Sequence, residues 1–101
     1  MWEQLKPTHP EAIIYAKFED FATIEVEKKR SRNSDIVHYM VNVRIIDITD
    51  QCFDIYKLDE LEKALSVIRQ KIEDLYNNIP LYTDIQIEHW IDEFCDKISE
   101  Y

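Results

Sequence analysis

The strongest pattern in the chain is an unbroken apolar stripe between residues 58 and 79. Large aliphatic side chains recur there at alternating intervals of three and four residues, at Leu58, Leu61, Leu65, Ile68, Ile72, Leu75 and Ile79. At about 100° per residue, this spacing aligns them on one face of a helix of about six turns. We therefore predict a central helix over residues 58–79. A D-x-x-E signal, Asp59 with Glu62, starts it. A left-handed cap at Asn77–Asn78, followed by Pro80, ends it.

The residues before this helix alternate between apolar and polar side chains, which is typical of strands. The alternation is cleanest between residues 22 and 27, so residues 12–18 and 21–28 are predicted to form a hairpin. A second interpretation of the first segment stays open, because a capping box of Thr8 and Glu11 would start a helix over residues 9–20. We prefer the strand.

The longest strand is predicted over residues 36–48. Its apolar residues change phase at Ile46, so we expect a bulge near Ile45–Ile46. A turn at Asp50–Gln51 then leads into a short strand over residues 52–56. The polar residues 28–34 are expected to form the loop before the long strand.

The last helix is predicted over residues 83–100, opened by the T-x-x-Q capping box of Thr83 and Gln86. Its apolar face consists of Ile87, Trp90, Ile91, Phe94, Ile98 and Tyr101. Residues 1–10 form an N-terminal arm in which Trp2 and Leu5 are spaced for one helical turn. Trp2 either tucks against the edge of the core, which we favour, or anchors a partner.

These elements give the order β-β-β-β-α-α, an α+β fold in one domain of 101 residues. A meander of about four antiparallel strands over residues 12–56 would present one apolar face. We expect the central helix to cross that face and the last helix to lie antiparallel beside the first.

Charge and composition narrow the function. The net charge of −9 disfavours nucleic acid as a direct ligand and favours a partner protein with a basic surface. The chain has 0 glycines, which excludes glycine-rich phosphate loops, dinucleotide fingerprints and nucleophile elbows. No apolar run could span a membrane and residues 1–10 do not resemble a secretory signal, so we expect a cytoplasmic protein. Cys52 and Cys95 are then expected to be reduced, small, partly buried thiols, although a disulfide stays open.

The last helix carries the most informative polar pattern. Its acidic residues are Asp84, Glu88, Asp92, Glu93, Asp96 and Glu100, a set that we call the acidic ribbon. Lys97 is the only Lys or Arg after residue 79. Like charges four residues apart destabilise a helix by about 0.2–0.5 kcal/mol per pair. A mixture of acidic and basic residues would therefore keep the helix soluble at a lower cost in stability. The ribbon is either a solvated face or a surface that docks on a basic, nucleic-acid-binding groove of another protein.

Other chemically active residues suggest less. The basic run Lys28–Arg32 is best interpreted as a solvated hairpin tip, and otherwise as a phosphate contact or a partner for the ribbon of a second copy. His89 and Glu93 lie one turn apart but lack a further nitrogen or sulfur ligand nearby. The candidate nucleophiles Ser66 and Cys95 have no base close in sequence. We therefore expect no catalytic residue, no cofactor and no metal ion.

The small size, acidity and single-domain character resemble those of small phage or mobile-element inhibitors of host defence, anti-CRISPR proteins included, and of toxin immunity proteins. The resemblance covers the whole chain and no motif carries it. It implies a non-enzymatic inhibitor that masks a basic surface of its partner. The alternative is a structural or assembly protein, acting as a homodimer or as a subunit of a larger complex.

Overall fold

The computed structural model describes residues 1–6, 10–30, 32 and 35–99. The chain divides into two compact units, Met1–Leu58 and Asp59–Tyr101. Within the described residues, the first unit contains five strands of one sheet, and two helices follow it, so the predicted α+β class is confirmed. No described helix has the length and apolar content needed to cross a membrane.

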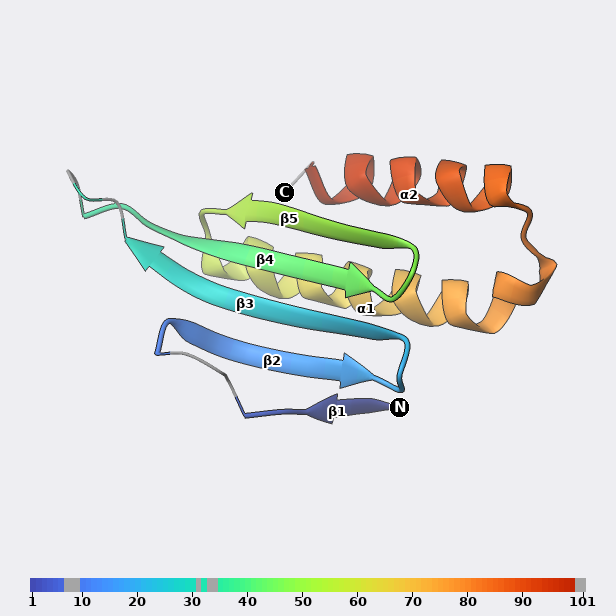
Figure 1. The fold of residues 1–101 in the computed structure, drawn as a ribbon. Helices are drawn as coiled ribbons and strands as arrows, with labels where there is room; N and C mark the ends of the chain where they lie inside the picture. The colour runs from blue at the N-terminus through green and yellow to red at the C-terminus, as the bar shows by residue number, and fades with distance from the viewer. Residues whose placement is uncertain (7–9, 31, 33–34, 100–101) are drawn as a thin grey trace. The chain divides into compact units, whose positions relative to one another are not determined.

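The first unit is an antiparallel meander. Its strands are β1 (Trp2–Gln4), β2 (Ala12–Phe18), β3 (Ala22–Arg30), β4 (Val37–Ile45) and β5 (Thr49–Ile55). They lie in the order β1-β2-β3-β4-β5, so each strand pairs with the next one along the chain (Figure 1). The sequence predicted this meander without its first strand.

Strand β1 replaces the helical turn that the spacing of Trp2 and Leu5 suggested. Trp2 lies opposite Phe18 in the register, and the Leu5 N–H donates to the Tyr15 carbonyl at 2.7 Å. The Trp2 ring lies against Phe18 with centroids 5.1 Å apart and is half-buried, so the tucked interpretation of Trp2 is confirmed. Cross-strand aromatic pairing of this kind stabilises an extended segment over a single helical turn.

Strand β2 confirms the preferred interpretation of residues 12–18 and rules out the helix over residues 9–20. The proposed cap residue Thr8 lies outside the described residues. A register shift between Ala12 and Ile14 marks a bulge in this strand, whereas the register of β4 against β5 runs without a break. The bulge expected near Ile45–Ile46 is therefore absent from this part of the sheet.

The turn between β4 and β5 comes earlier than predicted. It spans residues 46–48, where the Ile48 N–H donates to the Ile45 carbonyl at 3.0 Å, and Asp50–Gln51 lies within β5. Asp47 adopts a φ of 62°, a left-handed conformation that aspartate tolerates better than most non-glycine residues. Two isoleucines flank it, so the apolar pattern hid the turn.

Strand β3 also extends further than predicted. Lys28, Lys29 and Arg30 belong to it and pair with residues of β4, so the first part of the expected basic loop is strand. Arg32 lies in a turn and is exposed, and the other expected loop residues that follow it, 33 and 34, lie outside the described residues.

The two faces of the sheet differ in character. The apolar face contains the buried residues Ala16, Phe18, Ala22, Ile24, Val26, Val41, Val43, Ile45 and Ile55. The opposite, polar face contains Tyr15, Lys17, Thr23, Glu25, Glu27, Lys29, His38, Asn42, Arg44, Asp50, Cys52 and Asp54. This period of two follows from the alternation of side chains along each strand.

The second unit is a pair of helices that run in opposite directions, as predicted (Figure 1). Helix α1 (Leu58–Asn78) is followed by a short 3₁₀ turn, η1 (Ile79–Leu81), and by α2 (Asp84–Ser99). The buried residues of α1 are Leu61, Ala64, Leu65, Ile68, Ile72 and Leu75. All but Ala64 belong to the predicted stripe, whose first residue, Leu58, is exposed. In α2 the buried residues are Trp90, Phe94 and Ile98, and the first two stack with centroids 5.3 Å apart.

The ends of these helices were predicted unequally well. Asn78 is not a left-handed cap, because its φ of −116° and ψ of −3° lead directly into the 3₁₀ turn that contains Pro80. The Asn78 side chain instead donates to the Asp74 carbonyl at 2.7 Å. The capping box of α2 is confirmed: the Thr83 N–H donates to Gln86 Oε1 at 2.9 Å, and the Gln86 N–H donates to Thr83 Oγ1 at 3.3 Å.

Candidate functional site

The acidic ribbon lies on the exposed side of α2. Its members Asp84, Glu88, Asp92, Glu93 and Asp96 are all exposed, and Glu100 lies outside the described residues. The first and last of the five are twelve residues apart, which corresponds to a rise of about 18 Å along the helix axis. The structure therefore places five of the six predicted site residues at exposed positions of one helix, with Asp84, Glu88, Asp92 and Asp96 in a row that slants round its axis.

None of these five carboxylates is engaged by a cation in the part of the chain that the structure describes. Lys97 is on the same helix but forms no ion pair with them there. Acids of the first unit behave differently, since Glu11 and Glu27 both bind Lys29 and Asp20 binds Lys17. The ribbon is thus a concentrated and uncompensated negative charge.

The ribbon influences the thiol of Cys95, which lies between its members in sequence. Partial burial, followed by the charges of Asp92 and Asp96, raises the pKa of Cys95 above its ordinary value of 9.0. A raised pKa reduces the thiolate fraction at neutral pH and so disfavours nucleophilic chemistry. His89 is exposed, and no group of three potential metal ligands occurs among the described residues.

A groove of about 360 Å³ lies in the second unit, at the flank of α1 near the end of α2. It is lined by Ser66, Val67, Gln70, Lys71 and Lys97. Within the described chain, neither lysine forms an ion pair. Ser66, one of the two candidate nucleophiles, is exposed at this groove, and none of the described residues that line it is a histidine or a carboxylate that could act as a base.

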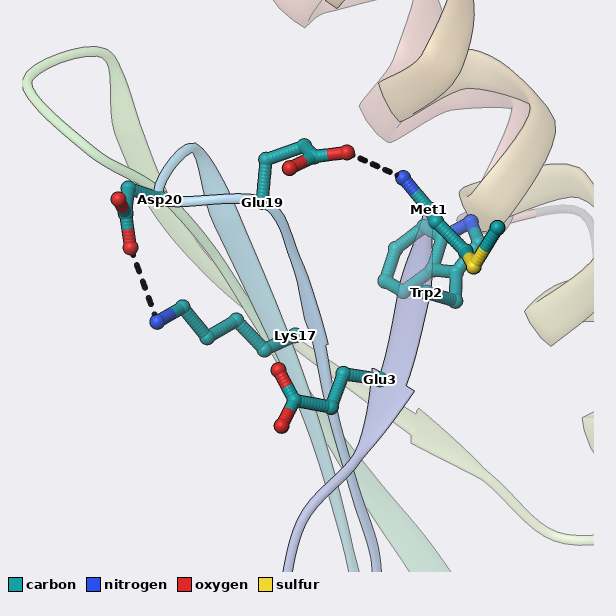
Figure 2. A pocket seen from close by; sticks show the side chains of 6 residues that line it. All are labelled: Met1, Trp2, Glu3, Lys17, Glu19 and Asp20. Carbon is teal, nitrogen blue, oxygen red and sulfur yellow. Dashed lines mark hydrogen bonds and ion pairs between the residues drawn. The ribbon is translucent and has the colours of Figure 1, made fainter.

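A second hollow, of about 420 Å³, lies beside β1 and is lined by Met1, Trp2, Glu3, Lys17, Glu19 and Asp20 (Figure 2). Its two cations are already engaged: the Met1 amino group lies 2.5 Å from Glu19 Oε1, and Lys17 Nζ lies 2.9 Å from Asp20 Oδ1 (Figure 2). The hydrogen bond and charge of Asp20 raise the pKa of Lys17 above its ordinary 10.5. These contacts satisfy the cations of the hollow internally, which leaves little for a ligand to complement.

The polar face of the sheet contains two further clusters. Lys29 binds Glu11 and also lies 3.1 Å from Glu27 Oε2, and Glu27 is only 8% exposed. The side-chain hydrogen bond to Glu11, then that to Glu27, raises the pKa of Lys29 above its ordinary 10.5. His38 lies 3.8 Å from Asp54 and packs against Tyr56. A burial as deep as that of Glu27 requires a charged partner, so this first cluster stabilises the sheet.

Sequence reasoning missed the polar face near β5. Asp50, Cys52 and Asp54 all lie on this face and are exposed, whereas the sequence predicts Asp50 in a turn and Cys52 partly buried. The error follows from the misplaced turn, because a turn at Asp50–Gln51 leaves Asp50 outside the strand that contains Cys52 and Asp54. A shallow hollow of about 330 Å³ adjoins Asp50 and Arg44. The Asp-x-x-x-Asp spacing in residues 50–54 was the signal that would have found this surface.

Known proteins add no further constraint on the site. No protein family, no curated protein and no solved structure matches the chain.

Proposed function

We propose that this chain is a non-enzymatic protein-binding inhibitor, of the anti-defence or immunity type, that masks a basic, nucleic-acid-binding surface of a partner protein. The observation that supports this function is the acidic ribbon of α2. Five exposed carboxylates follow one helix, and none of the five is neutralised by a cation of the described chain.

The electrostatics of the ribbon favour a binding role over a purely solvating one. Repulsion between neighbouring carboxylates is a cost that the isolated protein bears, and a basic partner relieves it on binding. In the complex, the carboxylates would occupy the places of nucleic-acid phosphates. Long-range attraction would also accelerate encounter, and salt would weaken it.

A second function, as an assembly subunit, is favoured by a different observation. Large apolar side chains are exposed around the connection between the helices: Tyr76 is 41%, Leu81 77% and Ile85 67% exposed. Exposed apolar residues close together in a chain are typical of protein interfaces. An interface built on them would persist at high salt, because it does not depend on charge.

The two functions are separated by a pulldown from a lysate of the organism that encodes the chain, at low and at moderate salt, read by mass spectrometry. The test variant is the triple reversal Glu88→Lys, Asp92→Lys and Asp96→Lys. The matched control is Glu3→Lys, Asp35→Lys and Glu62→Lys, which changes the net charge equally at exposed positions outside α2.

The proposed function predicts a basic, nucleic-acid-handling partner that is lost as salt rises and that added DNA or RNA displaces. The ribbon reversal should abolish its capture, and the control reversal should retain it. Equal capture by both variants would show that the ribbon is only a solvated surface. If both variants elute as a homodimer in size-exclusion chromatography, at low and at high salt alike, the assembly function is favoured.

A further inference from the structure

One edge of the sheet is a regular strand. Strand β5 pairs with β4 over seven consecutive residue pairs, from Ile45–Thr49 to Tyr39–Ile55, without a register shift. It is last in the strand order, and no described strand pairs with its other side. An edge strand presents backbone N–H and C=O groups on the side away from its neighbour, which is a template for a further strand.

Most of the devices with which proteins protect such an edge are missing from β5. The strand contains no proline, no lysine and no bulge, and its seven residues exceed the three of β1 at the opposite edge. Its charged residues are two aspartates, Asp50 and Asp54. An edge of this kind is protected against some strands and open to others, depending on their charge.

The polar side of β5 contains two acids, with Arg44 of β4 opposite Asp50 and His38 of β4 3.8 Å from Asp54. Asp50, Cys52 and Asp54 alternate along it and are exposed, and β5 itself contains no basic residue. Directly opposite residues on paired strands have their Cβ atoms about 4.5–5.5 Å apart, close enough for opposite charges to attract. An added strand would therefore be stabilised by lysine or arginine at the positions that face the two aspartates.

A second copy of the chain is a poor occupant of this edge. In a symmetric antiparallel pair of β5 strands centred on Cys52, Asp50 of one copy would face Asp54 of the other, twice over. Like charges directly opposite each other destabilise a strand pair. The same pairing would place the two Cys52 residues directly opposite each other. Self-association through β5 would therefore be detectable as a Cys52–Cys52 disulfide.

We propose that β5 binds an extended segment of a partner protein by adding it to the sheet edge, and that this segment has Lys or Arg at the two positions that face Asp50 and Asp54. Backbone hydrogen bonds supply the pairing and the two aspartates select for charge. This surface belongs to the sheet unit and does not include the acidic ribbon, so the inference does not depend on the proposed function.

The test uses the whole chain and three synthetic heptapeptides. The first alternates lysine with threonine, the second alternates glutamate with threonine, and the third is the lysine peptide with its backbone N-methylated at alternate residues. N-methylation keeps the charge of the peptide but removes the donors that an added strand needs. Binding is measured by fluorescence anisotropy, and the protection of Cys52 from alkylation is measured by mass spectrometry, in a Cys95→Ser background.

We expect the lysine peptide to bind, to slow alkylation of Cys52 at least tenfold at saturation, and to bind at least tenfold more tightly than either other peptide. The double reversal Asp50→Lys and Asp54→Lys should weaken its binding about tenfold or more. The double control Asp35→Lys and Glu62→Lys, which has the same net charge, should retain binding within about twofold.

Three results would overturn the inference. Equal binding of the lysine peptide and its N-methylated form would show that charge alone attracts it, without strand pairing. Binding that leaves Cys52 reactive would place the peptide elsewhere. Rapid formation of a Cys52–Cys52 disulfide dimer under mild oxidation would make a second copy the occupant. The triple reversal of the acidic ribbon tests the proposed function separately, and it should leave binding of the lysine peptide to β5 intact within the twofold range of the control.

Discussion

The tightest turn of the sheet offers a direct test of its register. Among the described residues, positive φ occurs at Glu19, with 50°, and at Asp47, with 62°, in a chain that contains 0 glycines. Asp47 is the cleaner position, because the Glu19 carboxylate also binds the Met1 amino group. Replacing Asp47 by glycine should therefore relieve backbone strain without removing a known contact.

The expected gain follows from two opposing terms. A left-handed conformation costs a non-glycine residue about 1–2 kcal/mol, and aspartate lies at the low end of that range. Glycine removes this cost but adds about 0.5–1 kcal/mol of conformational entropy to the unfolded chain. The net expectation for Asp47→Gly is therefore a stabilisation of at most about 0.5 kcal/mol, or an increase of at most about 4 °C in Tm for a protein of this size.

The assay is urea and thermal unfolding followed by circular dichroism. The matched control is Asp50→Gly, which changes the charge equally but lies within β5 and has no positive φ. Glycine there should destabilise the protein by about 0.5–1 kcal/mol. If Asp47→Gly is no more stable than Asp50→Gly, the turn is misplaced. The assignment of Asp50, Cys52 and Asp54 to one face would then fail with it.

Three further outcomes test the capping, the ion pairing and the thiols. Thr83→Ala should lower the free energy of unfolding by about 0.5–2 kcal/mol in urea, because it removes a capping bond of α2, and Thr83→Ser should not. The pKa of Lys29 is raised above 10.5, so its contribution to stability is complete below that pH and is lost as pH rises through the folded-state pKa. Urea midpoints measured from neutral to alkaline pH should show that Lys29→Met abolishes this alkaline loss of stability. The control Lys28→Met, at an exposed residue, should keep the pH dependence of the unaltered protein. If Lys29→Met keeps it as well, the pairing is contradicted. Burial raises the pKa of Cys52 and Cys95 above 9.0, so both should alkylate more slowly at neutral pH than free cysteine, with exposed Cys52 the faster by mass spectrometry.

The helices and the meander were predictable because their signals are local. The stripe from Leu58 onward determines the face of α1, and the reciprocal bonds of Thr83 and Gln86 need only residues three apart. The acidic ribbon was predictable for the same reason, since a helix places every fourth residue on nearly one side. A local pattern is enough where the structure itself is local.

The errors all concern the conformation of short backbone segments. Isoleucine on both sides of Asp47 resembled a continuing strand, so the turn was predicted too late and the first residues of β5 were missed. Asparagine at 78 suggested a left-handed cap, but Pro80 favours the 3₁₀ turn that the chain adopts. Strand β1 depends on pairing with β2, which the sequence of three residues cannot specify alone.

The two proposed binding surfaces should differ in how strongly their affinity for a partner depends on salt. Contacts of the acidic ribbon would be made by exposed charges, so screening should weaken them steeply and almost completely. A strand added to β5 would combine two such charge pairs with backbone hydrogen bonds, which do not depend on ionic strength in the same way. The affinity of the lysine peptide should therefore fall with salt and then level off, while capture by the ribbon should continue to fall. A peptide affinity that falls to zero with salt would leave charge as the only attraction at β5, and the strand edge would then have no part in binding.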